Sequence, residues 1–368
     1  MPLYHSSAPC MCISPALATG TTFTLGRKFS RATFWPEVVA SNATGLNFVG
    51  EICRYLMTAP PSPLDRAHKV RFMLGNGLRA DIWNRFRERF GIETILEFWG
   101  ATEAPAAIVN LNNNRFTEGA VGYLGKLLDT MIGRDRKIVQ VDIETAIIRR
   151  DPKSGFCIQC KPSEPGELVL KLEPEDIESK YQGYYGNSKA SSSKIMRNVF
   201  KKGDAWFRSG DVFSKDSEGR WFFVDRIGDT FRWKSENVST AEVGQVLALA
   251  PGVTEVNVYG VQLPNHDGRA GCAAVIFNGE PDEKVLAGVA AHALKELPRY
   301  AVPIFIRATK EFATTGTHKH LKNALRDEGA DPEKVREAGD KIFWLQDGRY
   351  VPFTEREWYR LKDAMVKL

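Results

Sequence analysis

Residues 225–243 read DRIGDTFRWKSENVSTAEV, and the character of the chain changes around this stretch. Upstream, from about residue 119, strand-like segments are separated by Gly, Pro and Asp turns, which predicts a β-rich subdomain. Downstream, helical patterns (STAEVGQVLALA, EKVLAGVAAHALKELP, HLKNALRDEG) alternate with strand patterns and predict a compact α+β unit that can fold separately. By composition alone, the stretch is also compatible with surface turns held by a salt bridge.

The first 115 residues alternate strand-like with helix-like segments. Three segments have a helical pattern of apolar residues: RATFWPEVVASNA, EICRYLMTA and RADIWNRFRERFG. Among them, TGLNFVG, VRFMLGNG and TILEFWGATEA contain short apolar runs that end at glycine turns. This alternation predicts a mostly parallel sheet with helices on its faces. Farther along, the predicted strands are AVGYLGKLL, KIVQVDIETAIIRR, GELVLKL and RWFFVDR.

The composition limits the class of protein. With 368 residues, 43% of them hydrophobic and 26% charged, the chain can bury a large core and is expected to form two domains. The net charge of +5 is a mild excess, which suits an anionic substrate or peripheral contact with an anionic membrane. We find no recognition-helix, zinc-finger or RNA-binding signature, so nucleic acid is not an expected partner. No run approaches the ~20 apolar residues of a membrane span, so no transmembrane helix is expected.

The cysteines and the last residues bear on cellular location. Six cysteines at irregular spacing favour a reducing, intracellular compartment. Cys157 and Cys160 form a CxxC pair of the kind that metal and redox sites use, but the pair has no second half and we expect a structural role. The final Val366-Lys367-Leu368 is a loose variant of a peroxisomal tripeptide, and an ordinary C-terminus explains it equally well.

Two turns that follow predicted strands carry candidate ligand-binding residues. At Gly75-Asn76-Gly77, positive φ and the missing side chains let the backbone approach a ligand, although a plain tight turn explains these glycines equally. In GATE, Thr102 and Glu103 follow the next strand. A threonine there can bond a phosphate oxygen and a glutamate can hold Mg²⁺, a cation that prefers oxygen ligands. Alternatively, the two residues cap and begin a helix.

Three charged residues farther along complete the candidates. Asp211 ends the predicted strand WFRSGD, where it can accept hydrogen bonds from a ribose diol. Arg226 is a candidate for neutralising phosphate or for bonding the same ribose, and Lys319 follows a glycine turn that presents it outward. A surface salt bridge and a solvated lysine are the plainer interpretations of these residues.

The order of these motifs is more specific than any single one. GNGLR, GATE, a strand ending in SGD, DRIGDTFRWKSEN and TGTHK together resemble the series found in AMP-forming acyl-CoA synthetases. DRIGDTFRWKSENVSTAEV is similar to the signature of the very-long-chain fatty acyl-CoA synthetase and fatty acid transport protein branch. PLYHSSA, LRADIW and KKGDAWFRSGD look like that branch too, so the resemblance runs from residue 1 to residue 368.

The resemblance implies a fold and an activity. Residues 1–227 would be the C-terminal portion of the large AMP-binding domain, and residues 228–368 the small, mobile C-terminal lid domain. The implied fold is α/β and α+β: a partial adenylate-forming domain, with a parallel sheet and a β-rich subdomain, followed by the lid. The implied enzyme joins long- or very-long-chain fatty acids to CoA through an acyl-adenylate, with ATP, Mg²⁺ and CoA, and couples this to fatty acid uptake. The implied location is the peroxisome, the endoplasmic reticulum or another membrane-associated site.

The resemblance also assigns roles to single residues. The residues implied to form the nucleotide site are Gly75, Asn76, Gly77, Trp99, Asp211 and Arg226. Trp99 would lie against the adenine, where the family more often has tyrosine, and Asp211 would hold the ribose hydroxyls. Thr102 would bond a phosphate oxygen and Glu103 would hold Mg²⁺. Lys319 would bridge the acyl carboxylate and the α-phosphate, where a fixed positive charge meets the developing negative charge.

Members of this family turn the small domain between the two reaction steps. Gly228 would be the hinge, because glycine absorbs a large φ/ψ change at little cost. After the turn Lys319 would leave the site, and a loop would enter it to line the CoA tunnel. That loop comprises Arg232, Trp233, Lys234, Ser235, Glu236 and Asn237.

Three departures from the family pattern bear on activity. The phosphate loop TSGTTGxPK is absent and is expected upstream of Met1, since TGTTFT at 19–24 lacks the closing Pro-Lys. Ser235 and Ala104 each stand where the family usually has glycine. Loss of a comparable phosphate-stabilising element costs roughly 10³–10⁵ in rate. The alternative is therefore a catalytically inactive truncated fragment that keeps only acyl, AMP or CoA binding or an interaction role. A third alternative keeps adenylation and changes the substrate to an aryl or polyketide acid.

Overall fold

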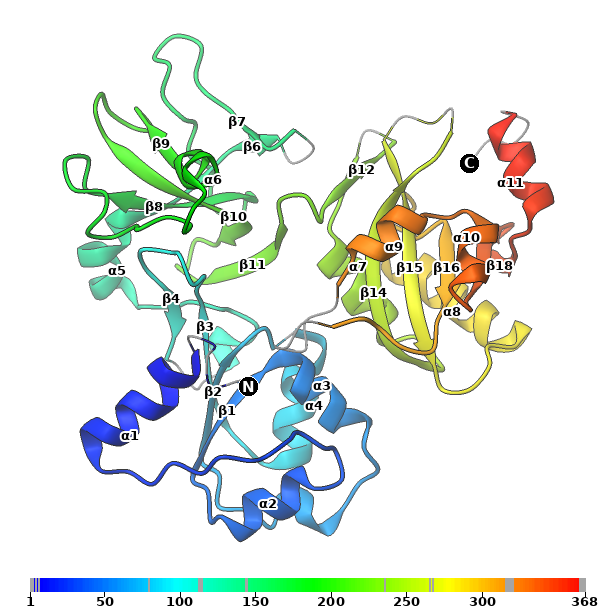
Figure 1. Cartoon of the computed structure of the whole chain (residues 1–368), viewed down its shortest axis with the longest axis horizontal. Helices are drawn as coiled ribbons and strands as arrows, with labels where there is room; N and C mark the ends of the chain where they lie inside the picture. The colour runs from blue at the N-terminus through cyan, green and yellow to red at the C-terminus, as the bar shows by residue number, and fades with distance from the viewer. Residues whose placement is uncertain are drawn as a thin grey trace. The chain divides into compact units, whose positions relative to one another are not determined.

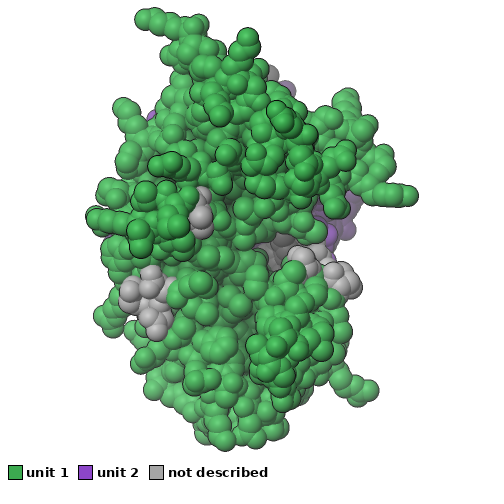
Figure 2. All heavy atoms as spheres, turned by 90° about the vertical axis from the view of Figure 1, so that its left-hand side faces the viewer, with its two compact units in different colours: residues 1–142, 147–223, 316–318 green, residues 143–146, 224–315, 319–368 purple. Residues whose placement is uncertain are grey.

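The chain is described by a computed structural model that covers residues 3, 5, 7–78, 80–111, 115–142, 145–234, 236–264, 266, 268–314 and 321–363. Its residues divide into two compact units (Figures 1 and 2). Unit 1 comprises residues 1–142, 147–223 and 316–318, and unit 2 comprises residues 143–146, 224–315 and 319–368. The main division falls after Phe223, and the predicted domain boundary after residue 227 stays a prediction.

The first part of unit 1 contains a four-stranded sheet, ordered β1-β2-β3-β4 (Figure 1). Its strands are β1 (Gly45–Val49), β2 (Phe72–Asn76), β3 (Thr94–Trp99) and β4 (Ile108–Asn110). The first three strands are parallel and β4 is antiparallel to β3, so the predicted mostly parallel sheet is confirmed. Its helical elements are η1 (Pro9–Ile13), α1 (Ser14–Thr19), α2 (Phe34–Ala40), α3 (Gly50–Thr58), η2 (Pro63–Arg66) and α4 (Ala80–Phe90).

Helices α3 and α4 are fixed to this sheet by their apolar faces. Helix α4 buries Ile82, Trp83, Phe86 and Phe90, which recur every three to four residues and therefore share one side of the helix. These residues form one core with buried side chains from α3 and from the three parallel strands. An almost fully buried ion pair between Arg54 and Asp81, 2.9 Å apart, joins the two helices. The carboxyl ends of β2 and β3 are thereby held on a rigid base.

The rest of unit 1 is the predicted β-rich subdomain. Its sheet has the order β11-β10-β8-β5, with β9 paired to β10, and β6 and β7 form a separate hairpin. The strands are β5 (Arg136–Val139), β6 (Val141–Asp142), β7 (Ile147–Ile148), β8 (Gly166–Leu172), β9 (Ile195–Arg197), β10 (Ala205–Lys215) and β11 (Trp221–Arg226). The helical elements are η3 (Arg115–Thr117), α5 (Lys126–Ile132), η4 (Gly133–Asp135) and α6 (Ser188–Ser193).

Two details of the predicted strands are wrong. The strand expected over AVGYLGKLL gives way to helix α5 at Lys126, because Gly125 adopts φ 75° and the residues that follow include good helix formers. Strand β10 does not end at Asp211 but runs on to Lys215. A register shift between Arg208 and Val212, with Gly210 at φ 79°, lets the strand continue past this bulge.

Unit 2 confirms the predicted α+β arrangement. Its five-stranded sheet has the order β14-β15-β16-β17-β18, in which only β15 and β16 are parallel; α8 connects these two, as a parallel pair requires. The strands are β12 (Phe231–Trp233), β13 (Glu236–Val238), β14 (Val253–Gln262), β15 (Arg269–Phe277), β16 (Phe305–Ala308), β17 (Lys341–Gln346) and β18 (Arg349–Pro352). The helices are α7 (Thr240–Leu247), α8 (Glu283–Glu296), α9 (Asn323–Glu328), α10 (Pro332–Glu337) and α11 (Glu355–Lys362).

Among the helices of the described residues, none combines the length and the apolar character needed to cross a membrane.

Candidate functional site

Strand β2 ends at Asn76, whose side chain carries an unsatisfied polar atom. Strands β2 and β3 are parallel with Gly75 opposite Glu97, so their carboxyl ends lie side by side. The side-chain oxygen Oδ1 of Asn76 is buried and has no hydrogen-bond partner within the described chain. Gly77 adopts φ 77°, which favours glycine. Glycine is required at position 75 for a different reason, which is close packing against β1. A Cβ at this position would lie 2.2 Å from the carbonyl oxygen of Phe48.

A buried carboxyl group supports this turn from behind, and sequence reasoning missed it. Glu97 is 1% exposed, and its Oε1 accepts a hydrogen bond from the Leu78 amide at 2.9 Å. The Gly77 amide also bonds this carboxyl group. Burial raises the pKa of Glu97 to about 8, above its ordinary value of 4.5, although both amide bonds act in the opposite direction. The one available signal was a glutamate inside the otherwise apolar run TILEFW.

The structure brings together Trp99 and Asp211, which are 112 residues apart in the sequence. The indole N–H of Trp99 donates a hydrogen bond of 2.7 Å to Oδ2 of Asp211. Both residues are buried, and Trp99 also packs edge-to-face on Phe213 with the ring centroids 5.4 Å apart. The backbone of Asp211 is held as well, because its N–H donates to the hydroxyl of Ser209 at 3.1 Å. The carboxylate predicted to bind ribose is therefore oriented by the side chain predicted to lie against adenine.

Thr102 and Glu103 lie in a turn after β3, so the alternative that they begin a helix is wrong. Thr102 is exposed and Glu103 is half-buried. The hydroxyl of Tyr184 donates a hydrogen bond of 2.8 Å to Oε1 of Glu103. The Tyr184 backbone is itself fixed, since its N–H donates to the Ser191 hydroxyl at 2.8 Å. Sequence reasoning missed Tyr184; the glycine-flanked run YQGYYG was its only local sign.

The CxxC pair belongs to no cluster of three potential metal ligands in the part of the chain that the structure describes. Cys157 and Cys160 are free thiols, and desolvation together with Glu164 raises the pKa of Cys160 to about 12. Within the residues that the structure describes, no group of three or more His, Cys, Asp or Glu side chains is arranged to hold an ion. Both thiols are thus poor ligands and nucleophiles at neutral pH.

In unit 2, Gly228, the predicted hinge, lies between two anchored carboxylates. Gly228 is exposed at φ 91°, and nothing lies within 4 Å of a Cβ added there. Before it, the buried carboxylate of Asp225 accepts hydrogen bonds from the Thr230 hydroxyl at 2.9 Å and from the Thr240 amide at 2.7 Å. Arg226, which follows Asp225, is exposed.

After the glycine, Asp229 is held by two cations that sequence reasoning did not single out. Its carboxylate lies 3.1 Å from Nζ of Lys322 and 2.6 Å from the guanidinium of Arg326. The same arginine donates a hydrogen bond of 3.0 Å to the carbonyl of Gly228. Partial burial opposes ionisation, but the two cations prevail and lower the pKa of Asp229. Asp229, just after the predicted hinge, is therefore fixed to Arg326 in α9 and to Lys322, the residue that precedes α9.

The predicted CoA loop is the β12–β13 hairpin. Arg232 pairs with Asn237 and Trp233 with Glu236 across the two strands, and Lys234 begins the turn at φ 50°. Trp233 is buried in the core of unit 2, where it stacks on His266 with the rings 5.9 Å apart. Lys234, Glu236 and Asn237 are exposed, and Arg232 is half-buried. Ser235 and Lys319 lie outside the described residues.

Comparison with known families accounts for both parts of the chain. Residues 1–173 match the family described as AMP-binding enzyme, and residues 242–319 match the AMP-binding enzyme C-terminal domain.

Similar sequences extend over the whole chain. A very long-chain fatty acid transport protein of Cochliobolus heterostrophus is 44% identical over 373 residues, which cover 100% of this chain and 57% of that protein. The isopenicillin N epimerase component 1 of Hapsidospora chrysogena is 43% identical over 97% of this chain and 60% of that protein. The very long-chain fatty acid transport protein of Saccharomyces cerevisiae is 39% identical over 100% of this chain and 56% of its own length. The chain thus spans just over half the length of these relatives.

Solved structures agree on the fold. The o-succinylbenzoate CoA synthetase of Bacillus subtilis, in complex with its acyl-adenylate intermediate, superposes with a TM-score of 0.66 at 21% identity, over 89% of this chain and 60% of that one. At this identity the likeness concerns the fold alone, which is that of adenylate-forming enzymes. The chain belongs to the AMP-binding enzyme family, in the branch of the very long-chain fatty acid transport proteins.

Proposed function

We propose that this chain serves an ATP-dependent enzyme that joins long- or very-long-chain fatty acids to CoA through an acyl-adenylate. The observation that carries the proposal is the hydrogen bond from Trp99 to Asp211, which orients a buried carboxylate near the carboxyl end of β3. Ligands of open α/β sheets bind at this end of the strands. The names of the relatives, which refer to very long-chain fatty acids, support the class of acid.

The nucleotide would be held by side chains that are already fixed. Asp211 would accept hydrogen bonds from the ribose hydroxyls, with Arg226 as a second polar contact to the ribose or phosphate. The buried, unpartnered Oδ1 of Asn76 suits a ligand N–H group such as the amino group of adenine, because a buried acceptor without a partner costs free energy. Trp99 would lie against the adenine while its N–H remains on Asp211. Preorganisation of this kind lowers the ordering cost of binding.

The residues near the GATE turn fit magnesium. Mg²⁺ is usually bound by one or two carboxylates together with substrate phosphates and water, so a single half-exposed carboxylate is sufficient. Glu103 supplies that carboxylate, and Tyr184 occupies Oε1, which leaves Oε2 for the ion. Bound Mg²⁺ would neutralise phosphate charge, and Thr102 would add a hydrogen bond to a phosphate oxygen.

The reaction itself would depend on groups of both units. Lys319 would place its ammonium between the acyl carboxylate and the α-phosphate, since two anions react slowly unless fixed positive charge meets them. For the second step, a turn of the small domain at Gly228 would bring the hairpin from Arg232 to Asn237 toward the CoA thiol. Exposed Lys234 is the hairpin residue best suited to a CoA phosphate.

Two alternatives are tested together with this proposal. The first is a chain that binds nucleotide or acyl ligand without turnover. The second is a different acid substrate, which a specific observation favours: a relative of nearly the same identity is named an isopenicillin N epimerase component. Sequence identity of this degree therefore does not fix the acid.

The deciding experiment combines AMP titration by calorimetry with ATP–pyrophosphate exchange on the full chain. Wild type and Asp211→Asn are compared, with Mg²⁺ and fatty acids from palmitate to lignocerate. Exchange that rises with fatty acid supports the ligase. AMP binding that Asp211→Asn abolishes, without any exchange, supports the binding-only alternative. A folded protein that does not bind AMP overturns the nucleotide site, and exchange with other carboxylic acids alone overturns the fatty acid assignment.

A further inference from the structure

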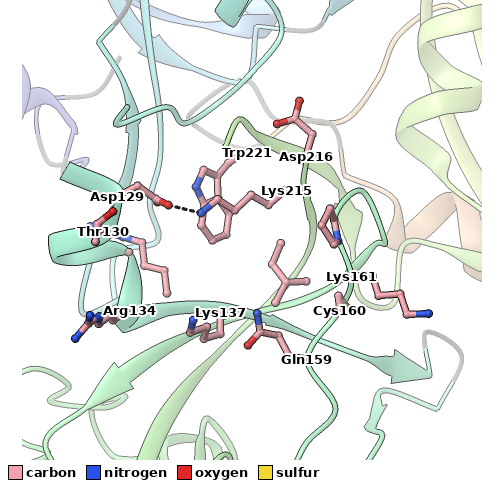
Figure 3. Close-up of a pocket in the computed structure, with 14 residues that line it drawn as sticks. Asp129, Thr130, Arg134, Lys137, Gln159, Cys160, Lys161, Lys215, Asp216 and Trp221 are labelled. Atoms are coloured by element: carbon pink, nitrogen blue, oxygen red, sulfur yellow. Dashed lines mark hydrogen bonds and ion pairs between the residues drawn. The ribbon is translucent and has the colours of Figure 1, made fainter. Parts of the chain in front are cut away.

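A pocket in the β-rich part of unit 1 is lined by cations from several elements. It has a volume of about 290 Å³, and its lining includes five cationic and two acidic side chains, a net charge of +3. The cations belong to η4, to β5, to the segment before β8 and to the end of β10; they are Arg134, Arg136, Lys137, Lys161 and Lys215. Figure 3 shows Arg134 and Lys137 on one side of the pocket and Lys161 on another. None of the lining residues belongs to the candidate nucleotide site.

Three of these cations have no counter-charge of their own. Within the part of the chain that the structure describes, no ion pair is formed by Arg134, Lys137 and Lys161. Both carboxylates of the lining are already paired. Asp129 lies 2.7 Å from Lys215, which is the contact dashed in Figure 3. Asp216 lies 2.7 Å from Arg220. An anion that enters the pocket therefore meets uncompensated positive charge.

One acceptor in the lining lacks a hydrogen-bond donor. Oδ2 of Asp129 accepts a hydrogen bond from Nζ of Lys215 at 2.7 Å, whereas Oδ1 is buried and has no partner among the described residues. Gly133 leaves space beside that oxygen, because a Cβ there would lie 2.7 Å from Oδ1. An ionised carboxylate can only accept hydrogen bonds, and a buried acceptor without a partner costs free energy. A ligand that suits the pocket therefore combines negative charge with an O–H or N–H donor.

The volume and the aromatic wall of the pocket limit the ligand further. Ligand pockets usually measure about 300–1,000 Å³, so this one suits a small anion. Trp221 is 2% exposed, and Nζ of Lys215 lies 4.8 Å from the centre of its six-atom-scale ring system. Because the indole is buried, it offers no open face on which a nucleotide base could stack. The pocket thus favours a phosphate without a base attached to it.

We propose that this pocket binds inorganic pyrophosphate. Near neutral pH, pyrophosphate is a multiply charged anion that still carries an acidic O–H. Its oxygens would accept charge-assisted hydrogen bonds from the guanidinium of Arg134 and from the ammonium groups of Lys137 and Lys161. Its O–H would donate to Oδ1 of Asp129. The inference goes beyond the proposed ligase activity, and binding requires neither a nucleotide nor an acyl substrate.

Other small anions fit the same pocket less well. Sulfate, ionised carboxylates and the phosphodiesters of lipid headgroups all lack an acidic O–H near neutral pH. Each of them would place an acceptor of like charge against Oδ1 of Asp129, and like-charge contacts weaken binding. Orthophosphate keeps an O–H but carries less charge than pyrophosphate, so it should bind more weakly.

The test is calorimetric titration of the full chain with four anions, without Mg²⁺ or nucleotide. We expect pyrophosphate to bind most tightly. Orthophosphate and sulfate are a matched pair of similar size, and orthophosphate should bind at least about tenfold more tightly because only it can donate to Asp129. Dimethyl phosphate, which has the diester chemistry of a lipid headgroup, should bind as weakly as sulfate. Asp129→Asn should abolish the preference for orthophosphate over sulfate, since the amide group can donate to sulfate.

Variants locate the binding in the pocket. Arg134→Gln/Lys137→Gln should weaken pyrophosphate binding at least about tenfold. The control Arg149→Gln/Lys153→Gln removes an exposed arginine and an exposed lysine of unit 1 that do not line the pocket, and it should bind as the wild type does. Lys161→Gln, at an exposed side chain, should weaken binding severalfold and serves if the pocket pair does not fold, which thermal unfolding would show.

Four results would each overturn the proposal. They are a folded wild type that does not bind pyrophosphate, sulfate binding as tight as that of orthophosphate, full binding by the pocket variants, and an equal loss in the control pair. Dimethyl phosphate that binds as tightly as pyrophosphate would also overturn it, and would assign the pocket to a phosphodiester.

Discussion

Replacing Trp99 with phenylalanine separates the stability role of this side chain from its role in binding. The substitution removes the indole N–H that bonds Asp211 at 2.7 Å and keeps an aromatic ring that can pack on Phe213. A hydrogen bond to a charged group contributes about 1.5–3 kcal/mol, and the smaller ring leaves a cavity that costs about 1 kcal/mol more. We therefore expect the free energy of unfolding to fall by about 3 kcal/mol. For a unit of this size, that corresponds to a fall in Tm of roughly 6–12 °C.

The chain supplies a matched control on strand β10, the strand that also carries Asp211. The indole N–H of Trp206 donates to Oδ2 of Asp204 at 2.9 Å, and Trp206 is also buried and packed edge-to-face on a phenylalanine. Asp204 accepts further bonds from backbone amides, including that of Phe200 at 3.0 Å, and no role in binding is proposed for it. Trp206→Phe thus removes the same kind of bond away from the candidate nucleotide site.

The assay is thermal unfolding of both variants together with calorimetric titration of AMP. Both should lose stability, but only Trp99→Phe should raise the Kd for AMP, by about tenfold or 1.4 kcal/mol, because Asp211 loses its orientation. In the double variant Trp99→Phe/Asp211→Asn the two losses of affinity should not add, since each removes the same bond. Unchanged AMP affinity in Trp99→Phe, or an equal loss in Trp206→Phe, would refute the reasoning and leave Trp99 as a core residue.

Three further predictions concern single polar groups. Because the pKa of Glu97 in the folded chain, about 8, exceeds its ordinary 4.5, stability should fall by up to about 5 kcal/mol as pH rises between these values. Glu97→Gln should flatten this dependence in denaturant titrations, and an unchanged slope would exclude Glu97 as its source. Tyr184→Phe should raise the Mg²⁺ concentration needed for ATP binding about fivefold without changing AMP binding, whereas Tyr185→Phe, at a fully exposed neighbour, should change neither. Equal effects of the two would contradict our role for Tyr184. Asp225→Asn should raise amide exchange at Thr240, detected by mass spectrometry, and retained protection would show that the anchor does not depend on the charge.

The architecture was predictable where it depends on local periodicity. The apolar positions of RADIWNRFRERFG repeat at helical spacing, and α4 begins and ends within a residue of the predicted segment. The alternation of such segments with short apolar runs was enough to indicate the parallel sheet, because a parallel pair requires a crossover connection. In unit 2 the same reasoning located α7, α8 and the strands between them.

What could not be predicted depends on partners that are distant in the sequence. Nothing near Glu103 indicates Tyr184, which is 81 residues away, and nothing near Trp99 indicates Asp211. The buried state of Glu97 is hidden for the same reason, since an isolated glutamate in a strand usually marks a solvent-facing position. The error at Asp211 was of another kind: a glycine usually ends a strand, but here Gly210 forms a bulge that the strand passes through.

The anchors on both sides of Gly228 limit where the proposed turn of the small domain could have its pivot. The carbonyl of Gly228 accepts a hydrogen bond from Arg326, and Asp229 is bound to Lys322 and Arg326. Asp225 is bound to Thr230 and Thr240, and all these residues belong to unit 2. A rotation confined to Gly228 would have to break the bonds of Asp225, because that residue lies before the hinge while Thr240 lies after it. Each hydrogen bond to a charged group contributes about 1.5–3 kcal/mol. The bonds of Asp225 would therefore stabilise the orientation seen here over one reached by rotation at Gly228. If instead the pivot lies before Asp225, the cluster stays intact and moves with unit 2. Gly228→Pro therefore distinguishes the two possible pivots. If the pivot is Gly228, the substitution should slow the thioester step relative to adenylation. If the pivot lies before Asp225, the ratio of the two rates should not change.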